Sequence, residues 1–342
     1  MGSADNIVHN QLALVNGLLK RLLENTGVKK ELGSNLELTF EIKSKITSMI
    51  KIQERLQERL SKQEKQSIDK DLDILLGNFH YYDKQYTKAI ASYDKIIRSD
   101  PKETRALVNK GITHSRLGNH KEAITLYDRV LDIDPEFFDA LHCKGDSLAV
   151  LAKHDEALSC YEQTLAIDPN YFDGLYKKGL ALANLQNYDE AITYFDRALQ
   201  IQPNNVALLV DRGITTSKLG NYDEAISLYD RALEFDPKSF DAMHNKGLAL
   251  IQTKQYEDAL SFLDKTLEVD PSHEGVLFAK GVCLASLGKH QLAISYYEKS
   301  LEFSPAQPFA FYNLGYSLLQ LDKKSEALEQ FDKAISLDSG FE

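Results

Sequence analysis

The stretch VALLVDRGITTSKLGNYDEAISLYDRALEFDPKS, residues 206–239, holds the pattern that decides the fold. Leu209, Gly213 and Thr216 recur at intervals of three and four residues, which predicts one face of a first helix. Gly220 follows that face and indicates a helix end, because glycine adopts the left-handed conformation without steric cost. The first half of the stretch therefore predicts a short helix and a turn.

The second half of the stretch predicts a second helix. Asn221 is followed three residues later by Glu224, a spacing typical of a helix N-terminus. Asp236 and Pro237 indicate the end of that helix, since proline disfavours helical geometry in the residue before it. The same N-terminal signal recurs at Asn119 with Glu122 and at Asn187 with Glu190. We therefore expect a helical hairpin that occurs more than once.

The prolines give the period of this hairpin. They recur every 34 residues, at Pro101, Pro135, Pro169, Pro203, Pro237, Pro271 and Pro305. Self-similarity at a fixed period of this size indicates a stacked repeat array. We number the positions of each unit from the third residue after a proline, so that Thr104 is position one of its unit.

Small and large residues recur in phase with the prolines. Position eight is glycine at Gly77, Gly111, Gly145, Gly179, Gly213, Gly247, Gly281 and Gly315. Position twenty is always alanine, and position twenty-four is a large apolar residue, aromatic in seven of eight units. Glycine inside a helix costs about 1 kcal/mol relative to alanine, so eight of them need a packing reason. We expect position eight to lie where two helices approach closely, with glycine facing alanine.

This pattern resembles the tetratricopeptide-repeat family in its period and in the residues at positions eight, twenty, twenty-four and thirty-two. The resemblance covers about 272 of 342 residues. It implies an all-α fold, a right-handed superhelical α-solenoid of helix-turn-helix repeats that follows an N-terminal helical segment, residues 1–69. The expected units are 70–103, 104–137, 138–171, 172–205, 206–239, 240–273, 274–307 and 308–341.

Position seven departs from the family pattern. Six units carry a cation where the family often has leucine, at Lys110, Lys144, Lys178, Arg212, Lys246 and Lys280. A long basic side chain can pack its aliphatic stem against protein and keep its charge in water. We expect these residues to do so, without a functional role.

Residues 1–69 do not share the period and contain two apolar seams. The first is Val8, Leu12, Val15, Leu19 and Leu22, and the second is Ile42, Ile46, Met49, Gln53, Leu56 and Leu60. These seams predict two helices, at about 5–25 and 36–66. Packing on the first unit is favoured because the end of a solenoid must be covered. Pairing with another chain and packing in the superhelical groove are the alternatives.

Composition excludes several classes of protein. The net charge is −11, which disfavours nucleic acid as a partner because a phosphate backbone needs a basic surface. No stretch approaches the apolar length of a membrane span. The 3 cysteines lack metal-site or disulfide spacing, which indicates buried thiols and a cytoplasmic location.

The family resemblance implies a concave surface formed by the first helices of the units, lined by positions two, five, six, nine, twelve and thirteen. The candidate peptide-binding residues on it are Arg105, Asn109, Arg116, Asp139, His142, Asp146, Asp173, Tyr176, Lys177, Asp241, His244, Asn245, Phe278, Phe309, Tyr312 and Tyr316. The acidic members favour a ligand with basic character, and the aromatic members favour an apolar anchor.

Asp139, His142 and Asp146 fall on one helix face, and such residues can hold a divalent metal. No motif supplies a further ligand, so the sequence predicts no metal site and no cofactor. A weaker expectation is that His142 and His244, each beside an aspartate, titrate near neutral pH. No nucleophile elbow, phosphate loop or dinucleotide motif is present, so no enzymatic activity is expected.

The sequence therefore leaves three candidate functions. The first is a non-enzymatic interaction module, a scaffold or adaptor that binds a protein or peptide segment in the concave groove. The alternative is a self-associating structural scaffold that forms a homo-oligomer through the N-terminal helices or the uncapped last repeat. The second alternative is a regulatory partner of an enzyme with a metal- or pH-sensitive groove.

Overall fold

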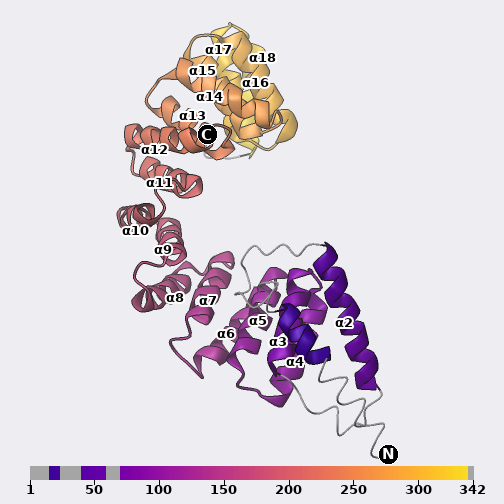
Figure 1. The fold of residues 1–342 in the computed structure, drawn as a ribbon. Coiled ribbons are helices and arrows are strands. Elements are labelled where there is room, and N and C mark those ends of the chain that lie inside the picture. The colour runs from indigo at the N-terminus through magenta and orange to yellow at the C-terminus, as the bar shows by residue number, and fades with distance from the viewer. Residues whose placement is uncertain (1–14, 24–39, 59–69, 338–342) are drawn as a thin grey trace, which may run out of the picture. The chain divides into compact units, whose positions relative to one another are not determined.

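The computed structural model describes residues 15–23, 40–58 and 70–337. Within these ranges every regular element is a helix, as Figure 1 shows. The chain divides into two compact units, residues 1–174 and residues 175–342, each held together by its own internal contacts. The fold is an all-α solenoid of helical hairpins.

Each hairpin consists of a first and a second helix. The first helices are α3 (Lys70–Tyr82), α5 (Thr104–Arg116), α7 (Phe138–Val150), α9 (Phe172–Asn184), α11 (Val206–Lys218), α13 (Phe240–Gln252), α15 (Glu274–Ser286) and α17 (Pro308–Gln320). The second helices are α4 (Tyr86–Ser99), α6 (His120–Leu131), α8 (His154–Ile167), α10 (Tyr188–Ile201), α12 (Tyr222–Phe235), α14 (Tyr256–Val269), α16 (His290–Phe303) and α18 (Lys324–Leu337). Two further helices, residues 15–23 and α2 (Phe40–Glu58), precede them.

The turn inside each hairpin contains one left-handed residue at position fifteen. Gly220 has φ +83°, as the sequence predicts, and Gly118 and Gly288 are similar. The other units place a residue with a side chain there, at Lys84, Ala152, Gln186, Lys254 and Asp322, with φ between 57° and 63°. A left-handed conformation costs such residues about 1–2 kcal/mol, so the hairpin packing holds these five turns in place.

The expected helix starts at asparagine are confirmed, but the asparagine side chains do not cap the helices. Asn119, Asn187 and Asn221 do precede second helices, but none of their side chains accepts a hydrogen bond from the helix N-terminus. Their ψ angles of 61–63° differ from the extended conformation that orients a cap. Backbone bonds close the turn instead, and Asn221 N donates to Thr216 O at 3.2 Å.

The helix ends at the prolines agree with the sequence. After α12, Asp236 has extended backbone with φ −132° and ψ 90°. Its Oδ1 accepts a hydrogen bond from the backbone N of Lys238 at 3.1 Å. This small aspartate turn leads the chain past the proline into the next first helix.

Position eight lies where helices approach closely, but its partner differs from the expected alanine. A Cβ built on Gly281 would lie 2.5 Å from Cε1 of Tyr297, and one on Gly179 would lie 2.5 Å from Cε1 of Phe195. The ring of position twenty-four therefore occupies the space that a side chain at position eight would need. The ring is what makes glycine necessary there.

The cations of position seven are also used differently from the expectation. Five of them form ion pairs with position twenty-five of the preceding unit, namely Lys110 with Asp94, Lys144 with Asp128, Arg212 with Asp196, Lys246 with Asp230 and Lys280 with Asp264. Only 11–25% of each basic side chain is exposed. The charge is therefore held between repeats rather than left in water. Lys246 Nζ also lies 4.0 Å from the ring centroid of Phe262.

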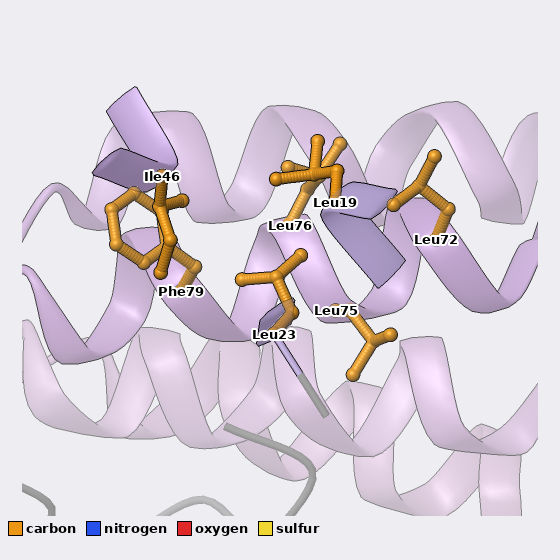
Figure 2. Close-up of a cluster of buried hydrophobic side chains, with 7 residues drawn as sticks. All are labelled: Leu19, Leu23, Ile46, Leu72, Leu75, Leu76 and Phe79. Atoms are coloured by element: carbon orange, nitrogen blue, oxygen red, sulfur yellow. The ribbon is translucent and has the colours of Figure 1, made fainter. Parts of the chain in front are cut away.

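The N-terminal helices dock on the first hairpin. Figure 2 shows Leu19, Leu23 and Ile46 against α3, where they pack on Leu72, Leu75, Leu76 and Phe79. The packing that the sequence favours is thus present in the described residues. Val8, Leu12 and Leu60 of the expected seams lie outside them.

Polar contacts hold the same cap in place. Gln53 is 5% exposed, and its Nε2 donates to Oδ1 of Asn16 at 2.9 Å. Lys43 Nζ lies 3.0 Å from Oδ1 of Asp83, and this cation lowers the pKa of the Asp83 carboxyl against the opposing effect of burial. The described residues of the apolar seams therefore pack against the first hairpin of the same chain.

Candidate functional site

Consecutive first helices contact one another directly, from α3 to α5 to α7 in one compact unit and from α11 to α17 in the other. Consecutive second helices in the described part of each unit make no contact of comparable extent. The first helices therefore lie on the inner side of the curvature within each unit. We call the surface formed by their positions two, five, six, nine, twelve and thirteen the first-helix face.

In residues 1–174, the polar candidates are engaged within the protein. Arg105 Nη2 donates to Oδ1 of Asp71 at 3.2 Å, and its Nε donates to Oε1 of Glu103 at 3.0 Å. Asn109 Nδ2 donates to Oδ1 of Asn78 at 2.9 Å. Arg116 is exposed, and its Nε donates to the hydroxyl of Tyr81 at 3.2 Å. The contacts with Asp71, Asn78 and Tyr81 join α5 to the neighbouring first helix α3.

The structure brings His142 and Asp146 together but gives them a structural task. Asp146 Oδ1 accepts a hydrogen bond from the Tyr161 hydroxyl at 2.8 Å, and Oδ2 lies 3.8 Å from His142 Nε2. The His142 ring packs edge-on against Tyr171, with centroids 5.1 Å apart. The pair therefore fixes the position-twenty-four ring. Asp139, on the same helix, is partly buried.

Asp173 of α9 is exposed and lies 3.5 Å from the hydroxyl of Tyr171. In the part of the chain that the structure describes, no group of three or more His, Cys, Asp or Glu side chains could hold a metal ion. Two of the thiols are not activated, because burial raises the pKa of Cys160 and raises that of Cys283 to about 12. No described helix is long and apolar enough to cross a bilayer.

In residues 175–342, one part of the first-helix face carries two carboxylates. Asp211 on α11 accepts a hydrogen bond from the Tyr176 hydroxyl. Burial, together with the charge of Asp241 on α13, raises the pKa of the Asp211 carboxyl. Asp241 is exposed, and Lys177 on α9 is partly buried. Asp211 occupies position six of its unit, which the resemblance assigns to this face, and its contacts are visible only in space because its neighbours lie on other repeats.

The side chains of two other polar candidates in residues 175–342, Asn245 and His244, make contacts within the protein. Asn245 Nδ2 donates to the backbone O of Asp241 at 2.8 Å. His244 stacks on Phe240 and lies 5.4 Å from the ring of His273. Burial, followed by the nearby His273, lowers the pKa of His244, against the opposing effect of Asp241.

The remaining part of this face is aromatic. Phe278 on α15 is partly buried, with its ring centroid 5.8 Å from that of Tyr297. Phe309, Tyr312 and Tyr316 on α17 are 62%, 45% and 45% exposed. Their spacing of three and four residues places them on one side of α17. The structure therefore presents these predicted aromatic residues at the surface.

Comparisons with protein families agree with the repeat geometry. Tetratricopeptide-repeat models match residues 74–136, 170–238 and 308–341. A model described as anaphase-promoting complex, cyclosome, subunit 3 matches residues 218–300. No curated protein sequence matches the chain.

Solved structures similar to this chain include other repeat proteins. YrrB, described as "a TPR protein with an unusual peptide-binding site", is 26% identical, and the match covers 55% of this chain and 97% of YrrB with a TM-score of 0.49. MamA from Desulfovibrio magneticus RS-1, from residue 41 onward, is 22% identical over 49% of this chain and 96% of its own, with a TM-score of 0.47. From the family models, the 34-residue period and the helical hairpins, we conclude that this chain belongs to the tetratricopeptide-repeat family.

Proposed function

We propose that this chain is a non-enzymatic protein-interaction scaffold that binds a peptide or protein segment on the first-helix face of residues 175–342. The tetratricopeptide-repeat fold supports a role as an interaction scaffold, because stacked hairpins present an extended surface. The location of the binding site rests on one observation, the aromatic surface of α15 and α17.

That surface is unusual for this chain because it carries no charge. Charged residues make up 27% of the sequence, yet the twelve face positions of α15 and α17 include none. They are Gly275, Phe278, Ala279, Val282, Ala285, Ser286, Phe309, Tyr312, Asn313, Tyr316, Leu319 and Gln320. Four of them on α17 are large apolar residues that are 43–62% exposed. A contiguous apolar surface of this kind typically marks an interaction site.

The test uses a displayed library of random 12-residue peptides, panned against the whole chain. Enriched peptides should bind the wild type, and Tyr316→Ala should weaken them by at least about fivefold, as loss of an aromatic anchor does. The matched control is Phe303→Ala, which removes a ring of similar exposure, 54%, from the end of the second helix α16. Absence of any enriched peptide, or equal binding by Tyr316→Ala, would overturn the proposal.

A second candidate function is self-association through the outer surface of α18. Leu328 is 63% exposed, whereas Ile294, which occupies the same position in the preceding unit, is 5% exposed. Asp332 stands where other units hold the carboxylate of the inter-repeat ion pair, and it has no cation partner among the described residues. An antiparallel contact between two α18 helices would place Lys324 of each copy opposite Asp332 of the other.

This contact predicts a concentration-dependent molar mass above the 38.6 kDa of one chain. Leu328→Glu should return the mass to that of a monomer in light scattering. The N-terminal seams are already docked on α3, which favours α18 as the contact. A monomeric wild type at every concentration would exclude this second function and leave the first in place.

A further inference from the structure

We propose that the segment bound by residues 175–342 carries a basic side chain that pairs with Asp211 and Asp241, placed a few residues from an apolar side chain that packs on α15 and α17. This inference rests on the proposed function, because it names the chemistry of the ligand for the same face. It assigns Asp211 and Asp241 a binding role and makes the first-helix face a surface of two parts.

The two carboxylates lie on neighbouring helices. Asp211 lies on α11 and Asp241 on α13, and these two helices contact one another. The charge of Asp241 contributes to the raised pKa of Asp211, as expected for neighbouring like charges. The Tyr176 hydroxyl donates to one oxygen of Asp211, and no basic side chain among the described residues forms an ion pair with either carboxylate.

The acidic residues of the second helices provide the contrast. Asp196, Asp230 and Asp264 each pair with the cation at position seven of the following unit. In these three units the chain thus supplies a basic partner for the carboxylate that joins two repeats. Asp211 and Asp241 have no such basic partner among the described residues. A partner molecule with a guanidinium or ammonium group would supply the missing charge and relieve the repulsion between them.

The geometry of the helices sets the spacing within the ligand. α13 contacts α15, and α15 contacts α17. Packed helices lie about 8–10 Å apart, and an extended chain advances about 3.3 Å per residue. A basic residue at Asp241 would therefore precede or follow an apolar residue on Phe278 by about three residues. An apolar residue on α17 would lie about six residues away.

Position along the helices agrees with this path. Asp241 occupies position two of its unit, Phe278 position five, and Phe309 position two. All three lie in the first two turns of their helices, α13, α15 and α17. An extended segment that crosses the helices near their N-terminal ends would meet the carboxylate and both rings in succession.

The experiment compares peptides selected by the wild type with those selected by Asp211→Asn/Asp241→Asn. The same random 12-residue display library is panned against each whole protein. Asparagine keeps the size and the ability to accept the Tyr176 hydrogen bond while removing the charge. The control is Asp223→Asn/Asp258→Asn, which makes the same change of charge at two exposed aspartates in the first turns of α12 and α14. Circular dichroism establishes that each variant is folded.

The wild type and the control should enrich peptides with lysine or arginine three to six residues from a large apolar residue. The double variant should bind those peptides at least about tenfold more weakly, since loss of a charge-assisted contact costs more than about 1.4 kcal/mol. It should also lose the basic enrichment while keeping the apolar one. Peptides enriched without basic residues, or basic peptides that bind the double variant equally well, would overturn this inference alone. A library with no enriched peptide would overturn the proposed function itself.

Discussion

The contact between positions eight and twenty-four can be tested by adding one methyl group at Gly281. In Gly281→Ala the new Cβ would lie 2.5 Å from Cε1, 2.6 Å from Cδ1 and 3.0 Å from Cζ of Tyr297. Real Cβ atoms essentially never approach other carbons to 2.5 Å, so a ring or a helix must move. Tyr297 is fully buried, and its flat ring has no free space into which it can withdraw.

Two opposing effects decide the sign of the change. Alanine gains about 1 kcal/mol over glycine in a helix, and overpacking of a core costs about 1–3 kcal/mol. Three ring atoms at or inside 3.0 Å place Gly281→Ala at the upper end of that cost. We therefore expect a net loss of about 1–2 kcal/mol.

Unit six of the same chain provides the control. There Gly247 faces Leu263, and an added Cβ would lie 2.9 Å from Cδ2 and 3.1 Å from Cγ. A leucine can change its rotamer to make room, so the helix gain should offset most of the overpacking, and Gly247→Ala should be close to neutral. The double change Gly281→Ala/Tyr297→Leu should recover part of the loss, because it moves the site towards the geometry of unit six.

The assay is hydrogen exchange of α15 and α16 together with thermal unfolding followed by circular dichroism. Local exchange is needed because repeats unfold in part independently of one another. Gly281→Ala should speed exchange in these two helices, and Gly247→Ala should leave exchange in α13 and α14 nearly unchanged. Equal exchange in Gly281→Ala and wild type would refute the ring contact as the reason for glycine, as would a larger loss in Gly247→Ala.

Three further predictions concern charge and turn geometry. In urea unfolding, Lys246→Met should cost at most about 1 kcal/mol because Asp230 remains half-exposed to water, and Lys246→Ala should cost more because the buried stem is lost as well. Asp211→Asn should raise the unfolding temperature at pH 7 and leave it unchanged near pH 3. The pKa of Asp211 is raised in the folded state, so ionisation of this carboxyl opposes folding only when the pH is above its pKa in the unfolded chain. Ala152→Gly should stabilise the α7–α8 hairpin by up to about 1 kcal/mol in thermal unfolding, since Ala152 has φ +57° and is exposed. A lower melting temperature in either of the last two variants would contradict the stated cause.

The periodic residues allowed the hairpins to be predicted because their role is local. Gly220 ends a first helix and Asp236 follows a second one, and both effects depend on backbone conformation within a few residues. The left-handed turn at Ala152 could not be predicted by the same reasoning, because alanine has no preference for a backbone with φ +57°. That conformation is imposed by the packing of the two helices, which only the period of 34 residues indicates indirectly.

The partners across helices were harder to predict than the helices. Sequence spacing shows that Gly281 needs close packing, but both Ala293 and Tyr297 lie on the facing helix at positions twenty and twenty-four. Only the rotation of that helix decides that the ring is in contact. Lys246 is a similar case, since its partner Asp230 lies sixteen residues earlier on another hairpin.

The exposed residues of the candidate face were predicted best where the side chain is apolar and makes no specific polar contact. Tyr316 stands at a position that the resemblance assigns to the first-helix face, and it is exposed. Arg105 and Asn109 occupy positions two and six, which the resemblance assigns to the same face, yet their side chains bond to the neighbouring helix α3. A polar side chain can satisfy the protein or a ligand, and position within a repeat does not distinguish the two. Asp211 is the reverse case, because its unbalanced charge follows from neighbours on other helices.

The distribution of ion pairs separates the structural charges from those that a partner can use. In five units the carboxylate at position twenty-five is paired across repeats and contributes to the stacking of hairpins. Asp211 instead raises the free energy of the folded state, since burial opposes its ionisation at neutral pH. A residue that opposes folding and yet lies on an accessible face fits a site whose stabilising interaction comes from another molecule. If Asp211→Asn both stabilises the folded chain and weakens the binding of basic ligands, the two effects have one cause, the unpaired charge of Asp211. The part of the face that destabilises the free protein is then the part that recognises the partner.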